Sequence, residues 1–243
     1  MAEAKKNRPH DKSGLLKRPA HADPSSENIN LAAIRTGLLR WFRKSARKYP
    51  WRQTHNWFHL VMAELMLRRT RSDQVQSVYD AFTKRYKNPA RAHGDPDGVL
   101  DTIASLGLHW RNQQILDSIA FMSHTYGAST PKEQSDLTEI PGVGDYCNAM
   151  IRSRLYGDRL AAIDSNVARI YCRITGVPFH PEMRRKAWLK SMAQRLVQSG
   201  RSDPFETNLA FLDLAALICK PGRPDCANCP IRKHCATGSG QAC

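Results

Sequence analysis

The sequence predicts an all-α protein, and two observations carry this prediction. Apolar residues recur at helical spacing along most of the chain, as at Leu31, Ile34 and Leu38, and segments with Pro, Gly or Asp separate the repeats. No convincing pair of segments alternates apolar and polar residues in the way that paired strands do. The spacing predicts helices from residue 31 to just before Pro50 and then over 57–68, 71–86, 96–106, 110–126, 145–156, 164–175, 182–199 and 205–218.

The charge of the chain suggests a polyanionic partner. With 37 Lys and Arg against 22 Asp and Glu, the 243 residues carry a formal charge of +15, and the sequence pI is about 9.8. Residues 30–91 hold 14 of the basic side chains and only three acidic ones. Solvated helix faces would also explain such a run, but its clustering favours a surface that binds phosphate groups. We therefore expect a nucleic acid as the partner.

The sequence shows no segment that would target the protein to a membrane or to secretion. No apolar run is long enough to cross a bilayer, and the N-terminus has no hydrophobic core of a secretory signal. The polar composition of residues 1–29 is typical of a flexible basic tail. We expect a soluble, intracellular protein without a membrane partner, in the cytoplasm and associated with the nucleoid.

Four of the seven cysteines lie in one C-terminal stretch with the spacing C-x6-C-x2-C-x5-C. They are Cys219, Cys226, Cys229 and Cys235. Because disulfides are unlikely in a reducing compartment, this clustering points to a metal centre. Thiolates suit zinc as well as iron–sulfur clusters, and the ligand type alone does not decide between them.

This cysteine spacing resembles the cluster loop of the endonuclease III and MutY family of helix-hairpin-helix DNA glycosylases. The resemblance implies a 4Fe-4S cluster rather than zinc. A second motif, Pro141-Gly142-Val143-Gly144, lies between a helical turn and a helix and leaves backbone N–H groups open to a phosphate. A turn of this kind is weak evidence alone, but together with the cysteines it resembles the family's helix-hairpin-helix, here about residues 137–156.

The family's DNA-binding and catalytic residues can be carried over position by position. Gly142, Val143 and Gly144 are expected to bind the DNA backbone without reading its sequence, and we expect Arg169 to contact DNA as well. The essential carboxylate of the family matches Asp164, which would stabilise the positive charge that develops on the sugar during cleavage. Asp164 also begins a helix, so an N-cap is the alternative role, and the two roles can coexist. Asn166 matches a position that supports this carboxylate.

Two more residues complete the expected active site. Bifunctional members of the family carry a lysine at the position of Tyr146, and tyrosine cannot form a Schiff base. The resemblance therefore implies a monofunctional glycosylase without efficient strand cleavage, although Tyr146 could instead serve core packing. Glu64 matches the glutamate that enters the family's base pocket, where it protonates or hydrogen-bonds the leaving base. A carboxylate among Leu60, Val61 and Leu65 would be costly to bury without a function.

The excised base is inferred from the segment Leu67-Arg68-Arg69-Thr70. Adenine-removing members generally read Leu-Gln-Gln-Thr here, whereas Leu-Arg-Arg-Thr and the tyrosine resemble the mismatch thymine branch, often called Mig. This branch removes thymine or uracil opposite guanine, and we expect Arg68 or Arg69 near that guanine. The sequence ends eight residues after Cys235, whereas MutY proper continues into a further domain, which also favours the thymine branch. The alternatives are an adenine glycosylase acting opposite oxidised guanine or guanine, and a non-catalytic DNA-binding iron–sulfur regulator.

The resemblance also implies an architecture of two helical domains with a DNA-binding cleft between them. A six-helix domain of residues 56–160 would contain the hairpin. Residues 30–55 together with 161–243 would form the iron–sulfur cluster domain. We expect a monomer that binds double-stranded DNA with a mismatched or damaged base and flips that base into the cleft.

Overall fold

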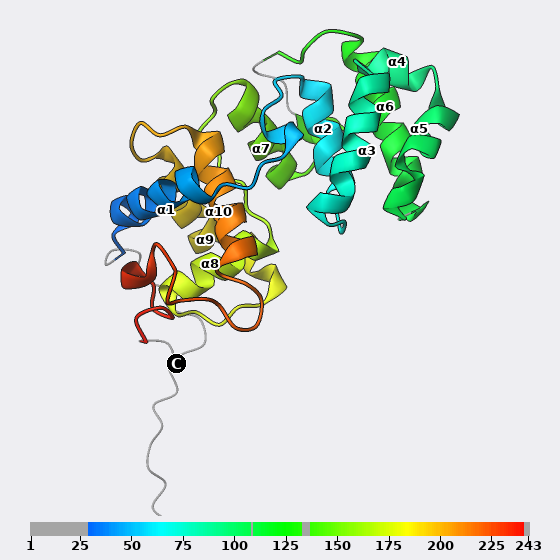
Figure 1. The fold of residues 1–243 in the computed structure, drawn as a ribbon. Coiled ribbons are helices and arrows are strands. Elements are labelled where there is room, and N and C mark those ends of the chain that lie inside the picture. Colours follow the sequence, from blue (N-terminus) through cyan, green and yellow to red (C-terminus); the bar gives the residue numbers. More distant parts are fainter. Residues whose placement is uncertain (1–28, 108, 133–136, 241–243) are drawn as a thin grey trace, which may run out of the picture.

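The computed structural model describes residues 29–107, 109–132 and 137–240, and every regular element in them is a helix. The predicted all-α class is therefore confirmed, whereas the predicted tail lies almost wholly outside the described residues. The α-helices, labelled in Figure 1, are α1 (Leu31–Ser45), α2 (Trp57–Met66), α3 (Ser72–Arg85), α4 (Pro89–His93), α5 (Pro96–Ile103), α6 (Asn112–Tyr126), α7 (Asp145–Leu155), α8 (Ser165–Thr175), α9 (Ala187–Gln198) and α10 (Pro204–Leu217). Short 3-10 turns are η2 (Pro50–Arg52), η3 (Ala104–Leu106), η4 (His109–Arg111), η5 (Leu137–Glu139), η6 (Pro181–Arg185) and η7 (Arg232–His234).

Two helices differ from the sequence-based expectation. The sequence reasoning missed α4, which is only five residues long and begins at Pro89 behind an Asn88 side chain that accepts from the Arg91 N–H. The single helix expected over 182–199 is divided, because Lys186 adopts an extended conformation (φ −68°, ψ 133°) between η6 and α9. None of the helices in the described part of the chain is both long and apolar enough to cross a membrane.

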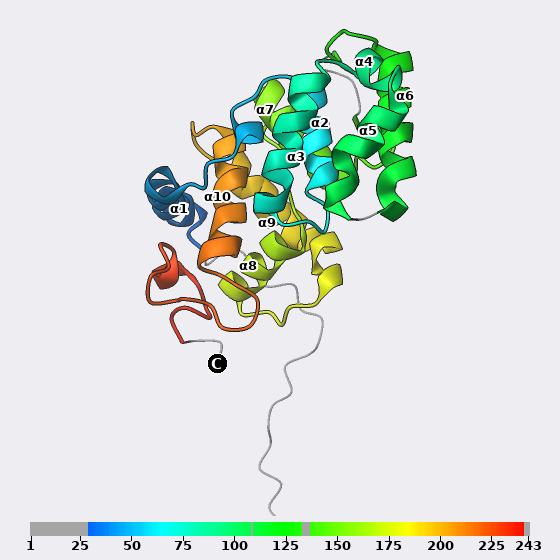
Figure 2. The ribbon, with the colours of Figure 1, turned by 45° about the vertical axis from the view of Figure 1, so that its right-hand side comes forward.

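The hydrophobic core consists of two clusters. The first, here called the α2–α6 core, gathers buried residues of α2, α3, α5 and α6, and the second, the α8–α10 core, gathers those of α1, α8, α9 and α10. Helix α7 contributes to both, since Cys147 and Ile151 belong to the first and Ala149 and Met150 to the second. In Figure 1, α7 correspondingly lies between the two groups of helices. Helix α1 packs beside α10 in both views, although the two are distant in sequence (Figure 2).

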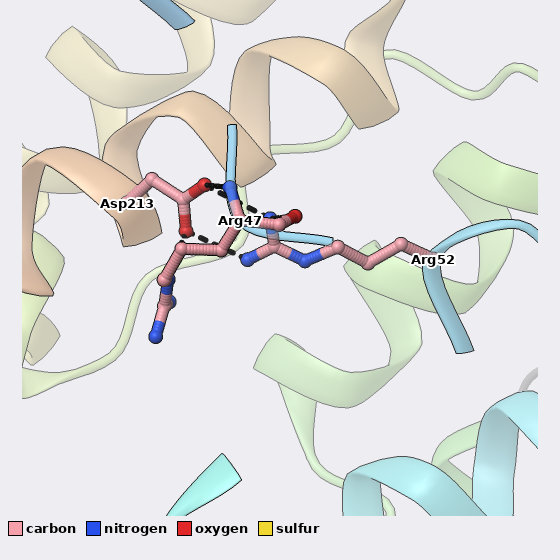
Figure 3. A network of polar contacts seen from close by, with 3 residues as sticks. All are labelled: Arg47, Arg52 and Asp213. Atoms are coloured by element: carbon pink, nitrogen blue, oxygen red, sulfur yellow. Dashed lines mark hydrogen bonds and ion pairs between the residues drawn. The ribbon is translucent and has the colours of Figure 1, made fainter. Parts of the chain in front are cut away.

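A buried ionic network ties the α1–α2 connection to α10 (Figure 3). The Asp213 carboxylate has no exposed surface and accepts from Arg47 Nε at 2.6 Å and from Arg52 Nη2 at 2.7 Å. Its second oxygen accepts from the Arg47 backbone N–H and from Arg52 Nη1, each at 2.9 Å. Burial alone would raise the pKa of Asp213, but the hydrogen bonds and charge of Arg52, together with Arg47, outweigh it and leave the pKa below its ordinary value. The network holds the connecting segment in place beside the cavity described below.

Candidate functional site

Asp164 is held as the N-cap of α8. Its Oδ1 accepts the Val167 backbone N–H at 2.7 Å, and its Oδ2 accepts from Asn166 Nδ2 at 2.9 Å. The N-cap expected from the sequence is therefore confirmed. Each carboxylate oxygen has a donor, so the orientation of the group is fixed, and its side chain remains half-buried.

Arg169 lies inside the protein and continues this hydrogen-bonded chain. It is only 6% exposed and donates from Nη1 to Asn166 Oδ1 at 2.8 Å. Its Nη2 donates to the backbone carbonyl of Cys219 at 2.9 Å. Internal acceptors thus already use the guanidinium nitrogens of Arg169, and its expected contact with DNA stays a prediction. The side chain connects the start of the cysteine loop to Asn166 and so to Asp164.

Glu64, Tyr146 and Asp164 line one groove. This groove, here called the outer groove, is lined by Glu64, Leu67, Arg68, Arg69, Gly144, Tyr146, Cys147, Ile163, Asp164, Ser165, Asn166 and Arg184. Burial raises the pKa of Glu64 to about 7, and the negative charge of Asp164 adds to the effect, while the charges of Arg68 and Arg52 oppose it. Burial, followed by the charges of Glu64 and Asp164, also raises the pKa of Tyr146 well above its ordinary value.

A cavity of about 340 Å³ adjoins the outer groove and shares Glu64, Leu67, Tyr146 and Asn166 with it. Its other walls include Arg52 together with residues of both cores, which are Trp51, Ala63, Met150, Phe205, Leu209 and Ala215. The size falls within the range of small-molecule sites, about 300–1,000 Å³, and the lining combines apolar side chains with polar and charged ones. Such a cavity can accept a planar ring whose polar edge meets Glu64.

The glycine hairpin lies at the edge of the same groove. Gly142 has a φ of 84°, and a Cβ there would approach Leu65 Cδ2 to 3.0 Å, so the turn requires glycine. A Cβ at Gly144, by contrast, would meet no atom of the protein within 4 Å. No side chain caps the N-terminus of α7 at Gly144, which leaves its N–H groups open to an approaching anion. Val143 is buried in the α2–α6 core, so only its backbone is available at the hairpin.

The four C-terminal cysteines line one small cavity together. Burial raises the pKa of Cys229 to about 11, and the other three cysteines add to this electrostatically, which places all four near one another. Arg173 Nη1 lies 3.2 Å from Cys219 Sγ and donates to the Lys220 carbonyl at 2.8 Å. In the described part of the chain, no three His, Cys, Asp or Glu side chains are arranged to hold a single metal ion.

Sequence reasoning missed two buried charged residues that shape the site. Asp213 stands in the apolar run Phe211-Leu212-Asp213-Leu214, and a charge within such a run is itself a signal of an internal partner. Arg111 is 2% exposed and donates to carbonyl groups at the end of α2. No local pattern distinguishes Arg111 from the many exposed arginines of this basic chain.

The fold identifies the class of protein. A solved structure described as a thermostable thymine-DNA glycosylase matches with a TM-score of 0.77 and 25% identity, covering 89% of this chain and all of that one. A structure of endonuclease III in a non-covalent DNA complex matches with a TM-score of 0.68 at 19% identity, over 88% of this chain and 98% of that one. The fold is therefore that of the helix-hairpin-helix DNA glycosylases.

The sequence comparisons narrow this class to a family. A thymine-DNA glycosylase of Aeropyrum pernix is 34% identical over 211 residues, which cover 84% of this chain and 94% of that protein. A thymine/uracil-DNA glycosylase of Methanothermobacter thermautotrophicus is 28% identical over 82% of this chain and 90% of that protein. The human adenine DNA glycosylase is 27% identical over 84% of this chain and 39% of its own length. No protein-family model matches. The chain belongs to the thymine-DNA glycosylase family of the helix-hairpin-helix superfamily.

Proposed function

We propose that this protein is a monofunctional DNA glycosylase that hydrolyses the N-glycosidic bond of thymine or uracil opposite guanine in double-stranded DNA. The observation that carries the proposal is the meeting of Glu64, Tyr146 and Asp164 in one groove beside an uncapped glycine hairpin. The similarity to thymine and thymine/uracil glycosylases over most of the chain supports the choice of base.

Asp164 would act on the sugar. Breaking the N-glycosidic bond builds positive charge on the deoxyribose, and a carboxylate held in place stabilises this charge without having to reorganise. The bonds from Val167 and Asn166 provide that fixed orientation. The same carboxylate can orient or deprotonate the attacking water.

Glu64 would act on the base. A pKa of about 7 leaves much of this carboxyl group protonated at neutral pH, so it can donate a proton or hydrogen bond to a base carbonyl oxygen. The departing pyrimidine anion is stabilised in this way. The adjoining cavity would hold the flipped ring, with Tyr146 at its entrance.

Tyr146 occupies the position where bifunctional relatives carry the attacking lysine. A phenol cannot form the imine that leads to strand cleavage, so the product would be an intact strand with an abasic site. Tyr146 packs partly against both cores, which supports a role in which it contacts the flipped nucleotide from a fixed position.

The DNA would lie across the hairpin, at the junction of two domains. The two hydrophobic cores support a division into residues 56–160 and residues 30–55 with 161–243. The open N-terminus of α7 would bind a phosphate through the backbone of Gly142 to Gly144. We further propose a cytoplasmic, nucleoid-associated monomer, in keeping with the net charge of +15.

The chemistry of the four cysteines supports a 4Fe-4S cluster at the cavity that they line. Its donor set is four thiols from one short loop, and each of them lines the same cavity. When bound, the cluster would supply structural support rather than chemistry, shaping a basic loop that contains Lys220, Arg223, Arg232 and Lys233. Metal analysis of protein purified without oxygen tests this: about four irons per chain and an iron–sulfur absorbance are expected, whereas one zinc per chain would contradict the cluster.

The substrate experiment uses four duplexes that contain T:G, U:G, A:G or adenine opposite oxidised guanine. Abasic sites are revealed by alkali, and release of thymine and uracil is expected. Cleavage confined to the adenine duplexes would contradict the proposal, and nicking before alkali would contradict the monofunctional mechanism. The similarity to the human adenine DNA glycosylase makes adenine the second candidate. A non-catalytic regulator would release no base from any duplex while still binding DNA.

A further inference from the structure

A second groove adjoins the outer groove. This groove, here called the α9 groove, has a volume of about 790 Å³ and is formed by η6, α9, the start of α7 and the segment before Asp164. It shares Gly144, Tyr146, Ile163 and Arg184 with the outer groove, so the two meet beside the hairpin. A path therefore leads from Asp164 past Tyr146 to the surface of α9.

The lining of the α9 groove is strongly basic. Its basic residues are Arg68, Arg184, Arg185 and Lys190, and Asp145 is the one acidic residue that the structure describes among them. The outer groove, by contrast, contains the two carboxylates that the proposed mechanism uses. Arg68 already donates to the Gly142 carbonyl and to Gln114 Oε1, which leaves the cations of η6 and α9 for a ligand. A groove with this charge attracts an anionic chain.

Two of these cations form ion pairs that lie open to solvent. Lys190 Nζ is 3.5 Å from Asp145 Oδ2, and the two side chains are 51% and 88% exposed. Arg185 Nη1 is 2.9 Å from Glu182 Oε2, and both side chains are again more than half exposed. Ion pairs this exposed contribute little free energy, so a phosphate group can replace the carboxylate as the partner of either cation.

The uncapped N-terminus of α7 lies where the two grooves meet, since Gly144 lines both of them. The strand whose sugar lies at Asp164 carries phosphates on both sides of that sugar. A strand that passes the N-terminus of α7 can therefore continue along the α9 groove. Resting on the proposed function, we propose that Arg185 and Lys190 bind phosphate groups of the strand that carries the flipped nucleotide, and that the charge of Asp145 limits the strength of this contact.

The test maps the contact phosphate by phosphate. The probe is a duplex with a tetrahydrofuran abasic analogue opposite guanine, in which single phosphates of either strand are replaced by uncharged methylphosphonates. Wild-type affinity should fall by about threefold to tenfold at consecutive phosphates on one side of the analogue, in the strand that carries it. Lys190→Ala and Arg185→Ala should each abolish the loss at one of these phosphates, because the contact is then already absent. Two variants that keep every wild-type loss, or that abolish losses in the opposite strand alone, would overturn the assignment.

A matched control and a change of opposite sign sharpen the test. Lys186 is exposed and follows Arg185 but does not line the groove, so Lys186→Ala removes the same charge and should keep every wild-type loss. Lys190→Ala and Arg185→Ala should each reduce the slope of log affinity against log salt by about 0.9. Asp145→Asn should instead tighten binding by about threefold at low salt. An unchanged slope in either variant, or weaker binding in Asp145→Asn, would contradict the proposal.

The groove and the proposed function fail in different ways. A wild-type protein that shows the expected phosphate pattern but releases neither thymine nor uracil overturns the proposed function and leaves the DNA contact in place. A wild type that releases these bases, combined with Lys190→Ala and Arg185→Ala variants of unchanged phosphate pattern, overturns the role of the α9 groove alone.

Discussion

Replacing Glu64 by Gln should stabilise the protein at alkaline pH. Burial, with the charge of Asp164, raises the pKa of Glu64 from 4.5 to about 7. The folded protein thus keeps a proton that the unfolded chain releases, so its stability falls as pH rises from about 4.5 to about 7 and stays lower above that range. A pKa difference of about 2.5 corresponds to about 3 kcal/mol. Glutamine has a similar shape and cannot ionise, so the variant avoids this loss.

Thermal unfolding at about pH 4 and about pH 8.5 measures this effect. The thermal midpoint of Glu64→Gln should match that of the wild type at the lower pH and exceed it by about 6–12 °C at the higher pH. Base release should fall about 100-fold or more, because the amide cannot transfer a proton. The exposed Glu139 provides the control, and Glu139→Gln should leave the midpoint unchanged at both pH values. A Glu64→Gln variant with the same midpoint as the wild type at about pH 8.5 would refute the reasoning.

Three further substitutions test other parts of the site. Asp164→Asn should abolish base release yet keep DNA binding, and the free energy of unfolding should fall by no more than about 1.5 kcal/mol, since asparagine still caps the Val167 N–H and loses only the bond from Asn166; a larger loss would contradict this. Tyr146→Lys should permit strand nicking before alkali and trapping of the enzyme on DNA by borohydride, and an unnicked product would count against the position of this residue at the sugar. Asp213→Asn should destabilise the protein by about 3–5 kcal/mol in urea unfolding, because Arg47 and Arg52 lose a buried carboxylate; a change below about 1 kcal/mol would show that the network contributes little.

The helices were predictable from sequence wherever the apolar spacing persisted over several turns. The expected 57–68 and 145–156 became α2 (Trp57–Met66) and α7 (Asp145–Leu155), with errors at the ends only. The helix expected over 182–199 was wrong at its start, because apolar spacing continues through a 3-10 turn as easily as through an α-helix. Helix α4 was not predicted, because five residues are too few to show a periodic apolar pattern.

Only part of the candidate site could be predicted from the sequence. Asp164, Glu64 and Tyr146 could be named because a resemblance supplied their positions, and the structure brings them into one groove. The burial of Arg169 could not be foreseen, since its acceptors are carbonyl groups and an amide whose places depend on the fold. Arg68 and Arg69 are equivalent in sequence but differ in the structure, where Arg68 donates to the Gly142 carbonyl and Arg69 is exposed with a positive φ.

The two carboxylates of the groove have different surroundings, and these surroundings support the different roles proposed for them. Glu64 lies on a helix among apolar side chains, so its charged form is poorly solvated and it retains a proton to about pH 7. Asp164 begins a helix, where one backbone N–H and one amide donate to its oxygens and stabilise a negative charge. The charge of Asp164 in the same groove adds to the effect of burial on the pKa of Glu64. In the proposed mechanism Glu64 would therefore act on the base as a proton donor, and Asp164 would act on the sugar from its fixed position at the start of α8.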